Sequence, residues 1–254
     1  MSAQARTLGA AEPVASPAPV SPTARWVGAL AKTARIDAEP ERIFPRVIDE
    51  QAARHGDAPA LIGADETLSH AGLAARQNRY ARWALTRGLA KGDTVALLQR
   101  NCPDYLAIWL GLTRVGVRVA LLNTNLRTTG LAHCIRVAAP KLLIADTALA
   151  DALGPALREL ERPLEVVWQG GGEAVTLASA SADLSDEPLA SDEAPSVSVA
   201  DEALLIYTSG TTGLPKAARV SHHRIMSWTH WFAGLVAPEA GDRMYNCLPL
   251  YHSV

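Results

Sequence analysis

The sequence predicts an α/β protein whose mostly parallel sheet carries helices on both faces. Short apolar runs of strand length, such as residues 94–98 and 141–145, alternate with longer amphipathic stretches of helix length. These runs are continuously apolar, which is typical of strands that are covered on both sides. The connections between them are short, as expected where each helix crosses from one parallel strand to the next.

Capping and breaking residues set the expected ends of the elements. Ser69 can cap a helix that Gly88 ends, and Pro103 suits the first turn of a helix that stops at Gly116. Helices are expected over residues 43–54, 70–87, 103–115, 129–138, 148–160 and 222–235. Strands are expected over residues 60–62, 66–69, 94–98, 118–122, 141–145, 164–168, 203–207 and 217–220.

Two stretches of the chain lack this alternation. Residues 1–38 are predicted to be a disordered tail, because Ala, Pro and Ser dominate residues 1–23. Prolines at that density disfavour a helix and supply no strand donors. Residues 170–198 begin with three glycines and continue as an acidic stretch rich in Ser and Ala, which predicts a long solvated loop or an interdomain connection.

The composition limits the class of protein. The 254 residues are 48% hydrophobic with a formal net charge of −2, so a packed core can form and no basic field is available for nucleic acid. No apolar run reaches the roughly 18 residues of a membrane-spanning helix, and residues 1–23 lack the apolar centre of a secretory signal. Cys102, Cys134 and Cys247 are too scattered for a disulfide framework or a zinc site, which favours a reducing, cytoplasmic location.

The stretch after the strand expected at residues 203–207 has the properties of an anion cradle. Residues 208–216 read Thr-Ser-Gly-Thr-Thr-Gly-Leu-Pro-Lys. Gly210 and Gly213 allow turns in which successive N–H groups point inward. Lys216 adds a mobile positive charge that suits a polyphosphate. Because the stretch follows a strand directly, we expect it at the carboxyl edge of the sheet, where α/β proteins bind ligands.

This pattern is not a Walker A loop, in which Lys follows Gly directly and Ser or Thr comes next. Here Leu214 and Pro215 separate Gly213 from Lys216. The alternative interpretation is an ordinary surface turn rich in Ser, Thr and Gly. Phosphate binding is favoured because Lys216 is one of only four lysines in the chain, and because strand-like sequence flanks the stretch on both sides.

Residues 207–216 also resemble, at every position, the phosphate-loop signature of the adenylate-forming superfamily, which includes acyl-CoA synthetases, luciferases and the adenylation domains of peptide synthetases. Residues 67–69, 91–97 and 112–122 resemble other blocks of that superfamily, so the resemblance covers residues 40–254. Residues 120–127, 131–134 and 246–253 are similar to the fatty acid transport protein and very-long-chain acyl-CoA synthetase group.

The resemblance implies a ligase that activates a carboxylate with ATP and Mg²⁺ to an acyl-adenylate and passes the acyl group to coenzyme A. The residues implied to surround the β- and γ-phosphates are Thr208, Ser209, Gly210, Thr211, Thr212, Gly213 and Lys216. Thr208 is also the implied Mg²⁺ contact. Tyr251 and His252 match the aromatic–His pair beside the acyl carboxylate, which makes His252 the candidate catalytic residue. Its alternative role is that of a histidine packed at a strand end.

Two further groups of residues carry weaker expectations. His222 and His223 are adjacent, so they do not form the i, i+4 pair of a zinc site and are interpreted as polar residues at a helix start. Trp228, Trp231 and Phe232 are expected to pack against the core, with contact to an acyl chain as the alternative.

The resemblance implies that residues 39–254 are a truncated adenylation domain, the amino-terminal part of a long- or very-long-chain fatty acyl-CoA ligase. The family's Tyr-Gly-x-Thr-Glu and Thr-Gly-Asp motifs are absent from the sequence, so we expect this chain to be inactive alone. A ligase for another carboxylic acid and a non-catalytic remnant are the alternatives. The expected partners are fatty acid, ATP and coenzyme A, without nucleic acid. Peripheral membrane contact would suit a fatty-acid enzyme, and the oligomeric state is open.

Overall fold

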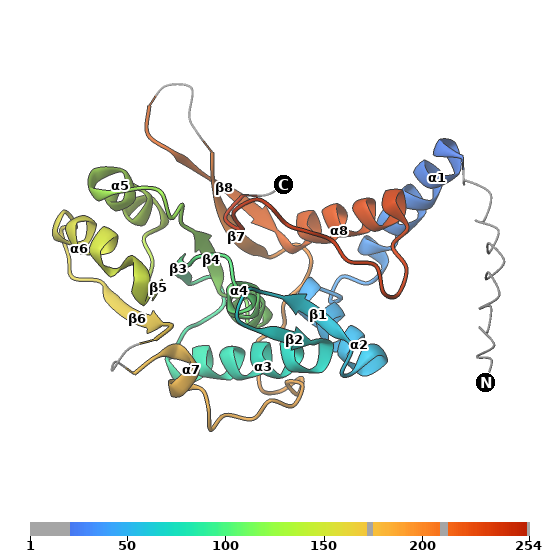
Figure 1. Ribbon diagram of the computed structural model, residues 1–254, viewed down its shortest axis with the longest axis horizontal. Helices are drawn as coiled ribbons and strands as arrows, with labels where there is room; N and C mark the ends of the chain where they lie inside the picture. Colours follow the sequence, from blue (N-terminus) through green and yellow to red (C-terminus); the bar gives the residue numbers. More distant parts are fainter. Residues whose placement is uncertain (1–20, 172–174, 209–212, 253–254) are drawn as a thin grey trace, which may run out of the picture.

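A six-stranded sheet with the strand order β6-β5-β3-β4-β7-β8 forms the centre of the protein (Figure 1). The computed structural model describes residues 21–171, 175–208 and 213–252. The strands are β3 (Thr94–Leu98), β4 (Arg118–Leu121), β5 (Leu142–Asp146), β6 (Glu165–Gln169), β7 (Glu202–Thr208) and β8 (Lys216–Ser221). All neighbours are parallel except β7 and β8. The predicted fold class is therefore confirmed.

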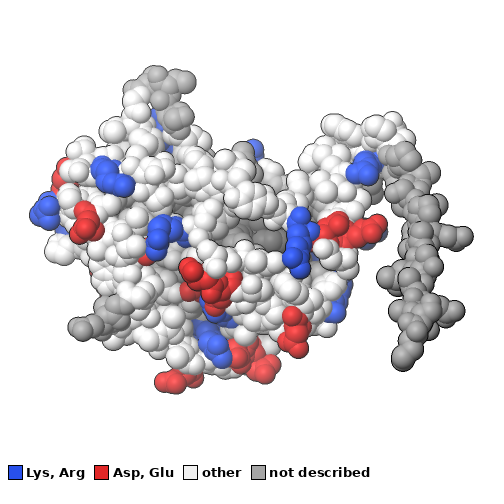
Figure 2. Space-filling model, viewed as in Figure 1, with Lys and Arg blue, Asp and Glu red and all other residues white. Residues whose placement is uncertain are grey.

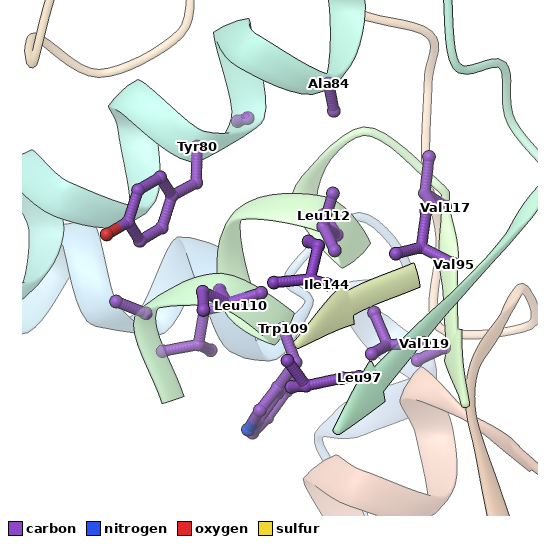
Figure 3. Packing of buried hydrophobic residues seen from close by; sticks show 14 of the residues in the cluster. Tyr80, Ala84, Val95, Leu97, Trp109, Leu110, Leu112, Val117, Val119 and Ile144 are labelled. Carbon is purple, nitrogen blue, oxygen red and sulfur yellow. The ribbon is translucent and has the colours of Figure 1, made fainter. Parts of the chain in front are cut away.

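Helices cover both faces of this sheet, because its central strands are apolar on both sides. Val95 and Leu97 of β3 belong to a core shared with α3 (His70–Thr86) and α4 (Pro103–Arg114). Ala96 and Leu98 alternate with them and belong to a second core under α5 (Thr128–Ala138) and α6 (Ala150–Arg158). Figure 3 shows the first core, where side chains of α3 and α4 meet those of the strands. The short 3-10 helix η2 (Thr147–Leu149) precedes α6.

The helices and strands between residues 44 and 86 begin and end near the predicted capping and turn residues. The helix α2 (Phe44–His55) leads into an antiparallel pair, β1 (Pro59–Ile62) and β2 (Thr67–Ser69). The Ser69 hydroxyl accepts a hydrogen bond from the backbone N–H of Gly72 at 3.0 Å and so caps α3. Gly88 and Gly116 follow α3 and α4 with φ of +68° and +78°, a conformation that favours glycine.

The disordered tail predicted for residues 1–38 is wrong from Ser21 onward. Residues Pro22–Thr33 form the helix α1, and Ile36–Ala38 form the 3-10 helix η1. Pro22 does not prevent α1, because it occupies the first helical turn, where a backbone N–H has no intrahelical partner. The Ser21 hydroxyl accepts from the N–H of Ala24 at 3.2 Å. Residues 1–20 lie outside the described part.

A distant helix explains why α1 forms. Figure 1 shows α1 beside α8 (His222–Val236), which lies at the carboxyl end of the described chain. The Arg25 guanidinium donates to the carbonyl of Leu235 at 2.8 Å. Ala29 is fully buried against Gly234, where an added Cβ would lie 2.3 Å from the Ala29 Cα. Tertiary contact of this kind supplies stability that a short isolated helix lacks.

Residues 175–198 of the acidic stretch dock on α3 rather than being solvated along their length. They contain a short helix, α7 (Leu177–Ala180), and bury Leu177 completely. Arg82 of α3 donates to the carbonyls of Ser185 at 2.8 Å and Glu187 at 2.7 Å. The same guanidinium pairs with Glu193 at 2.8 Å. The acidic composition that predicted a solvated loop therefore serves, in part, to pair with arginines of a helix.

One expectation for α8 needs correction, and a second is confirmed. Trp228 and Phe232 are 37% and 46% exposed, so they do not pack into the core, while Trp231 meets Trp26 of α1 edge to face at 4.9 Å. His222 begins α8 as expected, but it is fully buried, and burial lowers its pKa to about 4. His223 also fits the expectation of a polar residue at the helix start, since it is partly exposed and lies 3.3 Å from Asp37.

The surface carries charges of both signs. Figure 2 shows Lys and Arg interspersed with Asp and Glu on the face in view. Such a mixed surface differs from the basic face that marks proteins that bind nucleic acid. Across the described residues, no helix combines the length and apolar character needed to cross a membrane.

The close contact between α3 and α4 makes Gly111 a sensitive position. An added Cβ at Gly111 would lie 2.6 Å from the carbonyl oxygen of Gln77 and 2.8 Å from the Cβ of Tyr80. We expect Gly111→Ala to lower the free energy of unfolding by about 1–3 kcal/mol through overpacking. Gly154→Ala in α6 is the matched control, because the nearest atom would be the Arg158 side chain at 3.8 Å. Urea unfolding followed by circular dichroism measures both, and equal stability of the two variants would contradict the packing described.

Candidate functional site

The carboxyl ends of β3, β4 and β7 lie side by side at one edge of the sheet. The register pairs Leu97 of β3 with Leu121 of β4, and Leu121 with Ile206 of β7. Ligands of open α/β sheets bind outside the carboxyl ends of the strands. The predicted phosphate-binding stretch leaves β7 at this edge, and the Tyr251–His252 pair is hydrogen-bonded to the segments that leave β3 and β4.

The predicted phosphate-binding stretch connects β7 to β8. Thr208 and Lys216 are cross-strand partners at the mouth of this hairpin, and both are exposed. Gly213 has a φ of +132°, and an added Cβ there would meet no atom within 4 Å. Ser209, Gly210, Thr211 and Thr212 lie outside the described residues. Figure 1 shows β7 and β8 extending beyond the neighbouring strands at the top of the view.

Lys216 is available for an anion. Like Lys32, it forms no ion pair with any residue that the structure describes, whereas Lys91 and Lys141 are paired with Asp201 at 2.8 Å and Asp93 at 2.6 Å. Arg100 follows β3 at the same carboxyl edge of the sheet. Its guanidinium pairs with the Asp146 carboxylate at 2.6 Å. That hydrogen bond raises the pKa of Arg100 and holds its charge beside Asp146.

Two residues of α5 support the hairpin. The Nε2 of His133 lies 3.0 Å from the carbonyl oxygen of Pro215. Because a carbonyl oxygen can only accept, His133 carries its proton on Nε2 in this contact. The Tyr207 hydroxyl donates to the carbonyl of Cys134 at 2.6 Å, and burial raises the pKa of Tyr207, which keeps this donor neutral. Residues 131–134 belong to a block that resembles a known group of proteins. That resemblance does not predict the contact between His133 and the hairpin.

The Tyr251–His252 pair lies at the same edge, held by two asparagines. The amide nitrogen of Asn101 donates to the carbonyl of Leu248 at 2.8 Å, and its oxygen accepts from the N–H of Leu250 at 2.9 Å. Asn125 donates to the Tyr251 hydroxyl at 3.0 Å. Asn101 follows β3 and Asn125 follows β4. Sequence reasoning missed both asparagines as functional residues.

The two rings of the pair differ in exposure. Tyr251 is only 5% exposed and belongs to the main core, whereas His252 is exposed. Their ring centroids are 4.5 Å apart. His252 closes a turn through its N–H, which donates to the carbonyl of Pro249 at 3.1 Å. The structure thus places His252 after a turn with an accessible ring, not packed at a strand end. Among the described residues, no hydrogen bond joins this pair to the hairpin.

Thr208 is the candidate metal contact at this edge. Within the described residues, no group of three or more His, Cys, Asp or Glu side chains is arranged to hold a metal ion. Mg²⁺ in nucleotide sites keeps several waters and is held mainly by substrate phosphates with one or two protein ligands. One exposed hydroxyl at the mouth of the hairpin therefore fits a magnesium ion that arrives with a polyphosphate.

Comparison with known proteins agrees with this geometry. Residues 48–254 match the family described as AMP-binding enzyme. The chain is 35% identical over 224 residues to long-chain fatty acid transport protein 2 of Rattus norvegicus, which covers 84% of this chain and 35% of that protein. It is 32% identical over 209 residues to a medium/long-chain-fatty-acid–CoA ligase of Mycobacterium tuberculosis, covering 82% of this chain and 34% of that protein. The chain thus spans about a third of the length of these relatives.

A solved structure supports the fold. The crystal structure of a putative long-chain-fatty-acid CoA ligase from Rhodopseudomonas palustris superposes with a TM-score of 0.72 at 23% identity. The superposition covers 83% of this chain and 52% of that one. The mostly parallel sheet with helices on both faces is therefore shared with that protein.

The contact between His133 and Pro215 leads to a prediction for the hairpin. His133→Ala removes the donor, so the backbone at Lys216 should open more often, and its amide should exchange with solvent about 2- to 10-fold faster, as expected for one hydrogen bond. His133→Gln is the control, because its amide can still donate to the Pro215 carbonyl and should restore most of the protection. Hydrogen exchange resolved by residue measures both. Exchange at Lys216 that is identical in His133→Ala and the parent would show that α5 does not support the hairpin.

Proposed function

This chain belongs to the AMP-binding enzyme family, and we propose on that premise that it is the amino-terminal part of a long- or very-long-chain fatty acyl-CoA ligase. The observation that carries the proposal is the hairpin mouth at the carboxyl edge of the sheet, where Thr208 faces Lys216 and the lysine has no described carboxylate partner. The names of the similar proteins support a long-chain fatty acid as the substrate.

The proposed reaction has two steps. An oxygen of the fatty acid carboxylate attacks the α-phosphorus of ATP, the bond to the β-phosphate breaks, and pyrophosphate leaves. The thiol of coenzyme A then attacks the acyl carbon of the adenylate, AMP leaves, and a thioester remains. In the first step, negative charge increases on the departing pyrophosphate, so catalysis consists largely of holding and neutralising a polyanion.

The residues of the hairpin are proposed to hold that polyanion. Backbone N–H groups and hydroxyls of Thr208, Ser209, Gly210, Thr211, Thr212 and Gly213 would wrap the β- and γ-phosphates, with Lys216 as their cation. Mg²⁺ is proposed to enter with ATP and to take the Thr208 hydroxyl as a protein ligand, where it would neutralise phosphate charge.

Tyr251 and His252 are proposed to act on the acyl side of the reaction. Tyr251 is fixed by the core and by Asn125, so its ring forms one rigid wall at the edge of the sheet. The exposed His252 ring can donate a hydrogen bond to a carboxylate or adenylate oxygen beside that wall. This role makes His252 the proposed catalytic residue.

A cytoplasmic location with peripheral membrane contact is part of the same proposal. ATP and coenzyme A are cytoplasmic substrates, and a long-chain fatty acid is concentrated in membranes. The exposed apolar side chains of α1 and α8 support such contact, because exposed aromatic and aliphatic groups favour the interface of a bilayer. These side chains are Trp26, Val27, Leu30, Trp228 and Phe232.

Lys216 offers the direct test of the proposed function. In the full-length gene product, Lys216→Ala should slow formation of the acyl-adenylate by roughly 10- to 1,000-fold, the scale of losing one well-placed electrostatic contact. Lys216→Arg should restore the rate only in part, because a planar guanidinium does not reproduce a compact point charge. Thiol attack on supplied acyl-adenylate should change much less, since pyrophosphate has already left.

Single-turnover kinetics of the two half-reactions makes this measurement with palmitate or oleate. Lys141→Ala is the matched control, because Lys141 pairs with Asp93 at the opposite end of the strands. If Lys216→Ala forms adenylate within about twofold of the parent rate, a difference under ~0.5 kcal/mol, Lys216 does not contact the phosphates.

A further inference from the structure

Two side chains hold the segment that follows α8 by hydrogen bonds, beside the burial of Tyr251 in the main core. Residues 238–252 contain no helix or strand, and Met244 and Tyr245 are 68% and 89% exposed. Within the described residues, every hydrogen bond that links residues 238–252 to the rest of the protein involves Asn101 or Asn125. The remaining bonds of the segment are local, such as that from the Leu248 N–H to Asn246.

Asn101 bonds to the segment as a neighbouring strand would. Its amide donates to one backbone carbonyl, at Leu248, and accepts from a backbone N–H two residues later, at Leu250. This pairing uses a donor and an acceptor of one planar group, which neither Asp nor Leu can reproduce at the same position. Asn101 itself is held between the end of β3 and the start of α4 at Pro103.

Asn125 fixes the other end of the same turn. Its own backbone N–H donates to the Asn123 side chain at 2.8 Å, which sets the conformation after β4. Its amide then donates to the buried Tyr251 hydroxyl at 3.0 Å. With Tyr251 anchored, the turn closed by Pro249 and His252 leaves the His252 ring exposed, 4.5 Å from the tyrosine ring.

We propose that Asn101 and Asn125 are positioning residues that hold the His252 ring over the carboxyl ends of β3 and β4, where the fatty acid carboxylate is activated. This inference rests on the proposed ligase function for the role of His252. Neither asparagine bonds to the His252 ring itself, so each acts through the backbone or through Tyr251. Their loss should therefore misplace the acyl side of the site while the hairpin that holds the phosphates is unchanged.

The first arm of the test uses this chain and reports on position alone. In Asn101→Ala, the Leu250 amide loses its acceptor and should exchange with solvent about 2- to 10-fold faster. Asn246→Ala is the matched control, since Asn246 bonds only within its own segment and should leave Leu250 exchange unchanged. Unchanged Leu250 exchange in Asn101→Ala overturns the proposal.

The second arm uses the full-length gene product and separates the two substrates. For Asn101→Ala and Asn125→Ala, kcat/KM for the fatty acid should fall about tenfold or more, while the KM for ATP stays within about twofold, as expected when one side of a site is misplaced. Tyr251→Phe keeps the ring and removes the hydroxyl that Asn125 binds. The double variant Asn125→Ala/Tyr251→Phe should be no slower than the more affected single variant, because both changes remove one interaction.

Each result of the two arms bears on a different part of the proposal. Equal losses toward ATP and fatty acid would indicate general damage and overturn the positioning role, as would fatty acid kinetics within about twofold of the parent. Additive effects in the double variant would overturn the part assigned to Asn125. If the parent protein forms no acyl-adenylate, the proposed ligase function is wrong. The positioning role of the two asparagines in that reaction is then wrong as well. The exchange arm still decides whether Asn101 holds the segment.

Discussion

Parallel pairing of β4 with β7 is the constraint on which the rest of the structure depends. The chain leaves β4, builds α5, β5, α6 and β6 on one side, and returns to place β7 beside β4. Parallel strands have their carboxyl ends at one edge, so this return brings Thr208 to the edge where Asn101 and Asn125 already lie. Without it, the segment after β7 would share no surface with the segments after β3 and β4.

The segment between β6 and β7 is held by ion pairs and hydrogen bonds as well as by apolar burial. Between β6 and β7 the chain crosses α3, where Arg79 and Arg82 bind acidic side chains and carbonyls of the crossing segment. The segment also buries Leu177 and Val197. Arg79 and Arg82 therefore have structural roles, while Lys216, one of four lysines, stands at the mouth of the hairpin without a described carboxylate partner.

The sequence predicted what depends on neighbours in the chain. Continuous apolar runs gave the buried strands, and local caps such as Ser69 gave the helix starts, because these features reflect local geometry and burial on two faces. It failed for α1, since that helix is stabilised by Arg25 and Ala29 against the distant α8. The domain boundary at residue 39 stays a prediction, although residues 21–38 are not the disordered tail that was expected.

The candidate site likewise contains residues that the sequence identified and residues whose place only the folded chain reveals. Thr208, Lys216, Tyr251 and His252 stand in recognisable blocks, and their roles remain predictions. Asn101 stands in no such block, and Asn125 stands in the block of residues 120–127 without a role assigned to it, because an asparagine after a strand resembles an ordinary turn residue. Their partners lie 147 and 126 positions away in the sequence, a relation that only the folded chain reveals.

The central claim is that the carboxyl edge of β3, β4 and β7 binds the phosphates of a nucleotide. Titration of the isotope-labelled chain with magnesium pyrophosphate, followed by amide chemical shifts, tests it most directly. The account predicts shifts concentrated at Thr208, Gly213 and Lys216, and their loss in Lys216→Ala. Shifts confined to the opposite edge, near Asp93 and Lys141, or no shifts at millimolar pyrophosphate, would contradict it.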